Sequence, residues 1–270
     1  MRFLAAVLCS LVIMVSSSHA EDHIFNSTTA LKEQSLQFGE EALEVAKTPL
    51  DTKGYGLIGT LAVTGAVGLT YVFDEDIRNK LEGKKSKGMD TATDVGNVLG
   101  NPFLHLGIAA AMYGTGILAE SPRWKETGEM LGHAILLADA TTFVLKETIG
   151  RARPFAENDK GSFRPGQFKS NYDSLPSMHT SSSFAMASVM AATSESLPTK
   201  MLYYSAATFV GFSRIYQDKH WASDVILGAA IGELCGRIVT ATYVNKSRSK
   251  VSLVPLVSEN SAGLAFLGRW

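Results

Sequence analysis

The stretch Ser213-Arg214-Ile215-Tyr216-Gln217-Asp218-Lys219-His220-Trp221-Ala222-Ser223-Asp224 decides how the rest of the chain is interpreted. His220 precedes Asp224 by four residues, so a helix here would stack the carboxylate beside the imidazole. That carboxylate could accept the Nδ1 proton and leave Nε2 as a nucleophile or base. Arg214 adds a planar, permanently charged fork that suits phosphate. The stretch therefore predicts part of a phosphate site.

A second stretch supplies more positive charge. In Lys146-Glu147-Thr148-Ile149-Gly150-Arg151-Ala152-Arg153-Pro154, a lysine and an arginine stand seven residues apart. Two helical turns would put Lys146 and Arg153 on one face, although Gly150 suits a helix C-cap and is predicted to end the helix between them. Taken alone, such a pair is typical of a solvated helix end.

A third stretch, Leu175-Pro176-Ser177-Met178-His179-Thr180, reads as the start of a helix. Pro176 suits the first helical position, and the free N–H groups of that turn would form an anion site together with the Ser177 hydroxyl. Taken alone, a serine near a helix start is usually a cap, and a histidine with aspartate four residues on is usually a structural hydrogen bond.

The three stretches in this order resemble the type-2 phosphatidic acid phosphatase and vanadium haloperoxidase superfamily. That family's signature reads KxxxxxxRP, then PSGH, then SRxxxxxHxxxD. The chain has Lys146 to Pro154, then Pro176 to His179, then Ser213 to Asp224. The resemblance covers about residues 95–243 and implies an all-α fold with a phosphatase site that uses neither a metal nor a cofactor.

By position, the resemblance implies that His220 is the nucleophile that forms a phosphohistidine and that Asp224 orients it. It implies that His179 protonates the leaving oxygen and later activates water. The phosphate-binding groups would be Lys146, Arg153, Ser177, Met178 and Arg214. This agrees with the chemistry of the residues, because phosphoryl transfer is accelerated by positive charge around the oxygens and by a covalent intermediate.

Met178 departs from the family pattern, which has glycine there. Methionine would be strained if the position needs a positive φ, and costs little if the backbone is an ordinary helix start. Arg151 is an extra cation that is expected to be a solvated helix-end residue more often than a substrate ligand. His105 and His133 match no motif and are predicted to be satisfied core histidines. Trp221 either walls the pocket or packs in the core.

Hydrophobic patterning predicts an all-α bundle of about six core helices. An amphipathic helix is expected at residues 30–47, and a charged connection with a short helix at 74–94. A polar loop is expected at 151–175. The core helices are predicted at 54–73, in the uncharged stretch 95–119 with Gly100-Asn101-Pro102 as a helix start, and at 123–150, 176–194, 200–215 and 222–243.

The N-terminus predicts export. Arg2, an apolar run from Phe3 to Val15 and the small-residue site Ser18-His19-Ala20 form a secretory signal. The predicted divisions are a signal peptide at 1–20, an amphipathic helix and linker at 21–53, a phosphatase-like helical domain at 54–245 and a β-hairpin tail at 246–270. Without the signal, Cys235 is the remaining cysteine and is predicted to lie in the core.

Charge and length restrict the partners. The 270 residues carry a formal net charge of −1 and no long basic cluster, which argues against nucleic acid. Residues 54–73 are long enough to span a bilayer. However, three crossings before Lys146 would place the site on the side opposite to export. The sequence therefore favours an exported, periplasmic bundle that rests on a membrane surface.

These observations predict a metal-independent phosphatase of the cell envelope that hydrolyses phosphate monoesters or diphosphates, with lipid phosphates as the expected substrates. Three alternatives remain open: a periplasmic acid phosphatase acting on soluble phosphoesters, a vanadium-dependent haloperoxidase, and a phosphate-binding scaffold with a dead site. The presence of both His220 and Asp224 argues against the last.

Overall fold

The computed structural model describes residues 28–157, 159–249, 251–258 and 261–268, with side chains for residues 32–157 and 159–246. The chain divides into two compact units between Glu40 and Glu41, inside α2 (Thr28–Lys47). The first unit is described only through the first part of this helix. The predicted signal peptide lies outside the described residues, and the predicted domain limits remain predictions.

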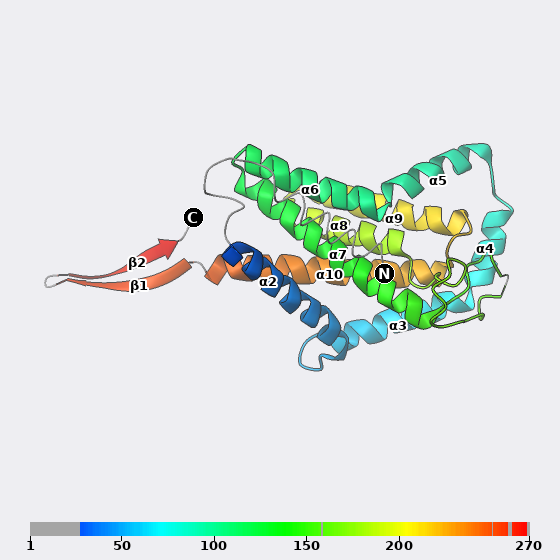
Figure 1. The fold of residues 1–270 in the computed structure, drawn as a ribbon, viewed down its shortest axis with the longest axis horizontal. Helices are drawn as coiled ribbons and strands as arrows, with labels where there is room; N and C mark the ends of the chain where they lie inside the picture. Colours follow the sequence, from blue (N-terminus) through cyan, green and yellow to red (C-terminus); the bar gives the residue numbers. More distant parts are fainter. Residues whose placement is uncertain (1–27, 158, 250, 259–260, 269–270) are drawn as a thin grey trace. The chain divides into compact units, whose positions relative to one another are not determined.

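The second unit is a helical bundle, which confirms the all-α prediction (Figure 1). Its helical elements are η1 (Thr48–Leu50), α3 (Gly56–Val72), α4 (Asp74–Glu82), α5 (Lys87–Leu99), α6 (Pro102–Leu118), α7 (Pro122–Ile149), α8 (Met178–Ala192), α9 (Leu197–Tyr216) and α10 (Ala222–Ser249).

One predicted element is divided differently in the structure. Residues 87–99 form α5, although much of this segment was expected to be a charged connection, and α6 is a separate helix. Ser86 caps α5 by accepting a hydrogen bond from the Met89 N–H, at 3.4 Å. Asn101 caps α6 through the Phe103 N–H, at 2.8 Å, with Pro102 at the first position. Each polar cap satisfies a free donor at a helix start. The start of α6 is the one that the sequence predicts, whereas α5 was not expected as a separate helix.

Gly150 ends α7, as the sequence predicts. It has φ of 64° and ψ of 42°, and its N–H bonds to the Lys146 carbonyl at 2.9 Å. A Cβ added here would come within 2.2 Å of the Arg164 carbonyl oxygen, so both the left-handed backbone and the close approach require glycine. The chain then enters the loop between α7 and α8 that carries several polar groups.

The centre of the bundle is α8, which packs against α7, α9 and α10. Its core face is made of small side chains, including Ser181, Ala185 and Ser188. On α10, Gly232 faces this surface so closely that a Cβ there would lie 2.1 Å from the Ser181 carbonyl oxygen. Small residues on both helices let the backbones approach, which holds the starts of α8 and α10 next to each other. Cys235 on α10 is buried and free, as predicted.

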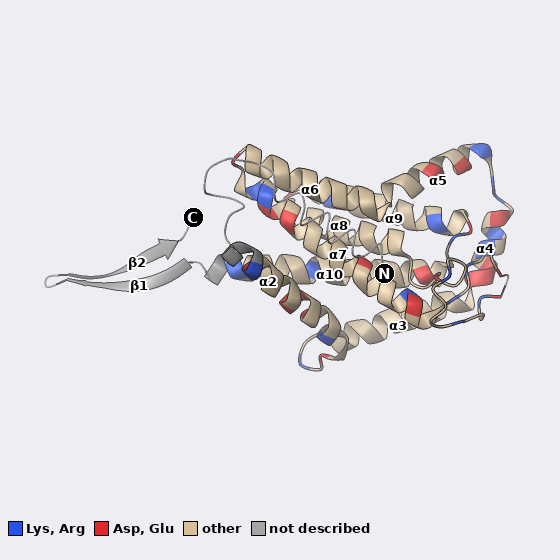
Figure 2. Cartoon of the chain, in the orientation of Figure 1, with Lys and Arg blue, Asp and Glu red and all other residues tan. Residues whose placement is uncertain are grey.

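Large apolar side chains are exposed on several helices of the bundle. They include residues on α3 (Ile58, Leu61, Leu69), α6 (Phe103, Leu118) and α9 (Leu197, Met201, Leu202). Figure 2 shows α3 and α6 without charged residues, while charges gather at the end where α4, the start of α5 and the loop after α7 lie. Among the described residues, α7 and the Ala222–Lys246 part of α10 are long and apolar enough to cross a membrane. A third span is possible if the bent pair α3–α4 counts as one. The apolar exterior is consistent with membrane association.

The tail contains two strands, β1 (Val251–Ser258) and β2 (Ser261–Gly268). They pair antiparallel, with Val251 opposite Gly268 and Ser258 opposite Ser261.

Candidate active site

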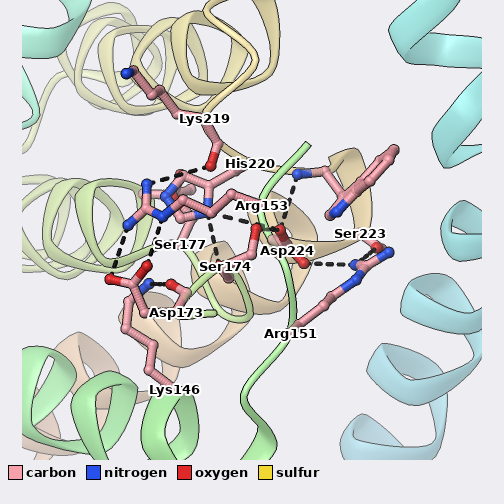
Figure 3. A network of polar contacts seen from close by, with 12 residues as sticks. Lys146, Arg151, Arg153, Asp173, Ser174, Ser177, Lys219, His220, Ser223 and Asp224 are labelled. Carbon is pink, nitrogen blue, oxygen red and sulfur yellow. Dashed lines mark hydrogen bonds and ion pairs between the residues drawn. The ribbon is translucent and has the colours of Figure 1, made fainter. Parts of the chain in front are cut away.

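The candidate site lies where four helix ends meet in the second unit. The end of α7, the start of α8, the end of α9 and the start of α10 are joined there by hydrogen bonds through the loop after α7 (Figure 3). For example, the Ser177 N–H bonds to the Asp224 carbonyl at 3.0 Å. The fold therefore brings together three stretches that are separated by up to about 70 residues in the sequence.

Lys146 and Arg153 are held by the same loop residue. The Lys146 ammonium group is buried on the last turn of α7 and donates to the Asp173 carbonyl oxygen. Arg153 binds the Asp173 carboxylate through both Nε, at 2.6 Å, and Nη2, at 3.0 Å, and its Nη1 donates to the Lys219 carbonyl at 3.3 Å. Asp173 was not singled out in the sequence, and it brings together two cations that Gly150 places in different elements.

Arg214 comes from the last turn of α9 and is also buried. Its Nη1 donates to the Asn97 side-chain oxygen from α5. Its Nε has no hydrogen-bond partner among the described residues, although the atom is buried. A buried guanidinium N–H without an acceptor is costly, and such a donor is well suited to an anionic oxygen.

His220 lies in the loop before α10 and is almost fully buried. Its Nδ1 lies 2.7 Å from the Ser174 carbonyl oxygen, whereas the nearest Asp224 oxygen is 3.7 Å away. A carbonyl oxygen can only accept, so Nδ1 carries the proton. When the ring is neutral, Nε2 holds the lone pair, as a nucleophile at this position requires. The acceptor is nevertheless Ser174 and not the carboxylate that was expected.

The position of Asp224 explains this difference. Trp221 is the residue before α10, so Asp224 is its third helical residue, and its Oδ2 accepts from the Trp221 N–H at 2.9 Å. This is the carboxylate half of a capping box, which turns the side chain back towards the loop. The same Oδ2 accepts from the Ser174 hydroxyl at 2.5 Å. Asp224 therefore holds the residue whose carbonyl binds His220.

The third motif lies at the start of α8. Ser177 is the residue before the helix and Met178 is the first helical residue, so Pro176 does not occupy the first helical position that was predicted for it. Met178 is not among the described non-glycine residues with positive φ, so methionine is unstrained here. The Ser177 hydroxyl is buried and accepts from the Thr180 hydroxyl at 3.0 Å.

Both motif histidines share one electrostatic environment. Burial and the charges of Arg214, Lys146 and Arg153, with a smaller effect of His105, lower the pKa of His179 to about 3. Burial and the charges of Arg153, Lys146 and Arg214, with His179, lower the pKa of His220 well below its usual value. Each of the three cations acts on both rings, so the five groups lie close enough to interact electrostatically. Both imidazoles are neutral at pH 7 in this state.

This environment predicts a pH-dependent stability. In the unfolded chain the two histidines bind protons as the pH falls through about 6.5. His179 in the folded chain stays neutral down to about pH 3. The unfolded state therefore binds more protons in this window, and the free energy of unfolding is expected to fall as the pH drops from 6.5 towards 3. Unfolding curves in detergent at a series of pH values would show a shallower decline for His179→Asn. An unchanged slope in this variant would contradict the assignment.

Residues outside the three motifs have clear roles in the structure. His105 is buried, with Nδ1 2.9 Å from the Ser182 hydroxyl and Nε2 2.6 Å from the Leu99 carbonyl. His133 contacts Glu41 at 2.8 Å. Both have hydrogen-bond partners, as predicted; His105 lies in the core, whereas His133 is only partly buried. Trp221 is buried and donates from Nε1 to the Ala152 carbonyl at 3.0 Å, so it packs in the core.

The expectation for Arg151 is wrong. Its side chain is fully buried and forms ion pairs with Asp224 and Asp74, at 2.6 and 2.8 Å. Figure 3 shows the guanidinium groups of Arg151 and Arg153 on opposite sides of the loop segment. Arg151 therefore binds Asp224 on one side of this segment, and Arg153 lies on the other side, near His220.

An open cleft of about 450 Å³ lies beside Arg214. Its wall includes Asn97 and Gln217, whose side chains both contact the Arg214 guanidinium. The remaining lining is polar and carries both signs of charge: Lys85, Asp90, Thr93, Asp94, Tyr216 and Lys219.

Comparison with known proteins agrees with this architecture. The family model described as the PAP2 superfamily matches residues 130–248. The lipid A 1-phosphatase of Porphyromonas gingivalis is 32% identical over 181 residues, which cover 66% of this chain and 37% of that protein. The lipid A 1-phosphatase of Rhizobium johnstonii is 32% identical over 108 residues, which cover 39% of this chain and 43% of that protein. The chain thus spans less than half the length of these two curated relatives.

The crystal structure of Aquifex aeolicus LpxE shares the fold. It superposes with a TM-score of 0.51 at 23% identity, over 63% of this chain and 95% of that one. The segment matched by the family model contains the six motif residues Lys146, Arg153, His179, Arg214, His220 and Asp224. By this match, the chain is similar to the PAP2 superfamily over residues 130–248, the segment in which the helical fold presents those six residues at one end of the bundle.

Proposed function

We propose that the protein is a phosphatase of membrane lipid phosphates that acts through a phosphohistidine at His220 and does not need a metal ion. The observation that carries the proposal is the convergence of Lys146, Arg153 and Arg214 on two neutral histidines. Three positive charges around one point suit the equatorial oxygens of a transferring phosphoryl group. The unpartnered Nε of Arg214 supplies a further donor for one of these oxygens.

The reaction follows from the state of each ring. The His220 Nε2 lone pair attacks phosphorus while the bond from phosphorus to the leaving oxygen breaks. His179 gives its proton to that oxygen as it leaves. Water then attacks the phosphohistidine, His179 takes up a proton from it, and orthophosphate departs with His220 neutral again.

His179 must be protonated for the first step, although it is neutral in the site without substrate. Bound phosphate would raise the pKa of His179, because its negative charge offsets the three cations that lower the pKa of this ring. Proton uptake by His179 is thereby coupled to substrate binding, which makes the acid available only when a phosphoryl group is present.

Two observations support a lipid as the substrate. The bundle exposes large apolar side chains on α3, α6 and α9, and α7 and α10 are long enough to cross a bilayer. The two curated relatives are named for a lipid phosphate, lipid A. We place the phosphoryl group among the cations, the alcohol portion towards the polar cleft beside Arg214, and the acyl chains along the apolar exterior, at the cell envelope.

Phosphate release from matched substrates tests this proposal. The full chain in mixed micelles with EDTA would be given phosphatidic acid, lipid A carrying a 1-phosphate, glycerol 3-phosphate and an aryl phosphate. We expect EDTA-resistant turnover, with kcat/KM for at least one lipid about tenfold or more above that for the soluble esters, because binding of the remote lipid lowers the barrier. The same assay in detergent without lipid tests whether micelles alone activate cleavage of the soluble esters.

Each result has a defined meaning. Cleavage of the soluble esters alone would identify a phosphatase of soluble phosphoesters and contradict the lipid proposal. Loss of all turnover with EDTA that returns on adding a divalent ion would contradict the metal-independent mechanism. A failure on all four substrates, by folded protein that binds vanadate, would contradict the phosphatase proposal for these substrate classes.

A further inference from the structure

A buried charged network contacts Asp224 on the side of the loop segment away from the Arg153 guanidinium (Figure 3). Arg151 donates from Nη1 to Asp224 Oδ1, at 2.6 Å, and from Nη2 to Asp74 Oδ2, at 2.8 Å. The Ser223 hydroxyl links the same partners: it accepts from Arg151 at 2.7 Å and donates to Asp74 at 2.5 Å. Asp74, Arg151, Ser223 and Asp224 are all at most 1% exposed.

The network continues to His220 through Ser174. The Ser174 hydroxyl donates to Asp224 Oδ2, its N–H donates to the Arg151 carbonyl at 3.0 Å, and its carbonyl accepts the His220 Nδ1 proton. Ser174 is itself fully buried. Asp224 and Arg151 thus fix both the side chain and the backbone of the residue that orients the imidazole, as Figure 3 shows for the Asp224 side.

From this geometry we propose that Asp74 and Arg151 are positioning residues that set the orientation and basicity of His220 through Asp224 and Ser174. Asp74 lies at the start of α4, outside the segment matched by the family model. The inference therefore assigns a role in the reaction to a part of the chain that none of the three motifs includes. It deepens the proposed function and rests on it.

The charge of the network gives a physical reason for this role. Asp74 and Asp224 carry two negative charges against one positive charge on Arg151, so the buried group has a net charge of −1. Figure 3 shows the Arg151 guanidinium on the other side of the loop segment from that of Arg153. The charges of Arg153, Lys146, Arg214 and His179 act on His220 as well. When Nε2 attacks phosphorus, the imidazole gains positive charge, and the net negative network stabilises it. Without Asp74 the network would be neutral and this stabilisation would be lost.

A purely structural role accounts less well for the two buried carboxylates. An ion pair that served packing alone would need only one carboxylate for one guanidinium, and burying a second carboxylate is costly unless it is used. Asp74 does satisfy the Ser223 N–H at 2.9 Å, which helps to start α10. A neutral acceptor could do this too, so capping alone does not account for the buried charge.

Asp74→Asn is the variant that tests the inference, because it removes the charge and keeps the shape. The matched control is Glu75→Gln, which removes a carboxylate from the next position of the same helix. Glu75 is about half exposed, and its nearest ion-pair contact is Lys160 at 4.0 Å. For Asp74→Asn we expect kcat on the best substrate to fall about ten- to hundredfold, the size typical of groups that orient an active-site histidine. KM and vanadate affinity should stay unchanged, since the cations are untouched.

A second readout does not depend on turnover. In ¹⁵N-histidine NMR of the full chain in micelles, the Nδ1–H resonance of His220 should move in Asp74→Asn and stay in place in Glu75→Gln. The NMR measurement tests the positioning role of Asp74 separately from the proposed phosphatase function, because its result stands even if no phosphatase activity is found. If Asp74→Asn fails to fold, Arg151→Lys keeps the net charge but breaks the two-sided contact. The His220 resonance should then still move, because Ser174 and Asp224 are held differently, and kcat should fall less than when the charge is lost.

The inference would be overturned by either of two results. One is an unchanged kcat and an unchanged His220 resonance in the folded variant. The other is a loss of vanadate affinity as large as the loss of kcat, because this would mean that Asp74 supports the whole site and not the nucleophile.

Discussion

Replacing His220 with alanine is expected to lower kcat by about a millionfold, the loss seen when the nucleophile of a covalent enzyme is removed. Without the imidazole no phosphohistidine forms, and water would have to attack the phosphate in one step. The three cations and His179 remain, so vanadate should still bind. Stopped-assay phosphate release, together with labelling by a ³²P-substrate after rapid quenching, measures both the rate and the intermediate.

The control is Lys80→Ala on α4, which also shortens a side chain to alanine. The Lys80 side chain is exposed and lies outside the three motifs and the cleft beside Arg214. This variant is expected to retain turnover and to form a base-stable, acid-labile phosphoprotein. Residual activity of His220→Ala close to that of the control would refute the covalent mechanism. Label that persists in His220→Ala would show that another group carries the phosphoryl.

The residue types of the site could be predicted because each motif is local. A lysine at a helix end, a serine before a helix and an arginine six residues before a histidine are visible in short stretches, and Gly150 marks the end of α7 correctly. These features depend on neighbours within one or two helical turns, where sequence spacing determines which groups meet.

The partners of these residues could not be predicted in the same way. Asp74 meets Arg151 across 77 positions, and Asn97 meets Arg214 across 117. No local pattern signals such pairs, because packing of α4 and α5 against later helices creates them. In the sequence, the acidic residues in the first turn of α4 indicate only the usual stabilisation of a helix dipole by negative charge at the N-terminus.

The link between His220 and Asp224 shows why correct spacing can give the wrong contact. Stacking at a separation of four residues requires both to be helical, and α10 begins only at Ala222. Asp224 consequently serves as an N-terminal cap and reaches His220 through Ser174. The helix start at Asn101-Pro102, by contrast, is confirmed, because a polar cap followed by proline is a local signal.

Arg214→Lys is expected to lower kcat by about a hundred- to a thousandfold, the loss typical of removing one donor that stabilises transition-state charge. Lysine keeps the positive charge, and so the electrostatic effect on His179 and His220 should largely remain. It lacks the fork that lets Arg214 donate to Asn97 through Nη1 while Nε remains available to a phosphate oxygen. Steady-state kinetics with the best substrate and vanadate inhibition would measure the loss. Vanadate affinity should fall as well, unlike in Asp74→Asn.

The control for this change is Arg237→Lys on α10, where the arginine is exposed and pairs with Glu233 one helical turn away. It makes the same chemical change away from the site and should leave both kcat and vanadate inhibition as in the unaltered protein. If Arg214→Lys matched this control, charge alone would suffice and the unpartnered Nε would have no part in phosphate binding. If instead Arg214→Lys lost activity only through a raised KM, the arginine would bind substrate and transition state equally, and the stabilisation would have to come from Lys146 and Arg153.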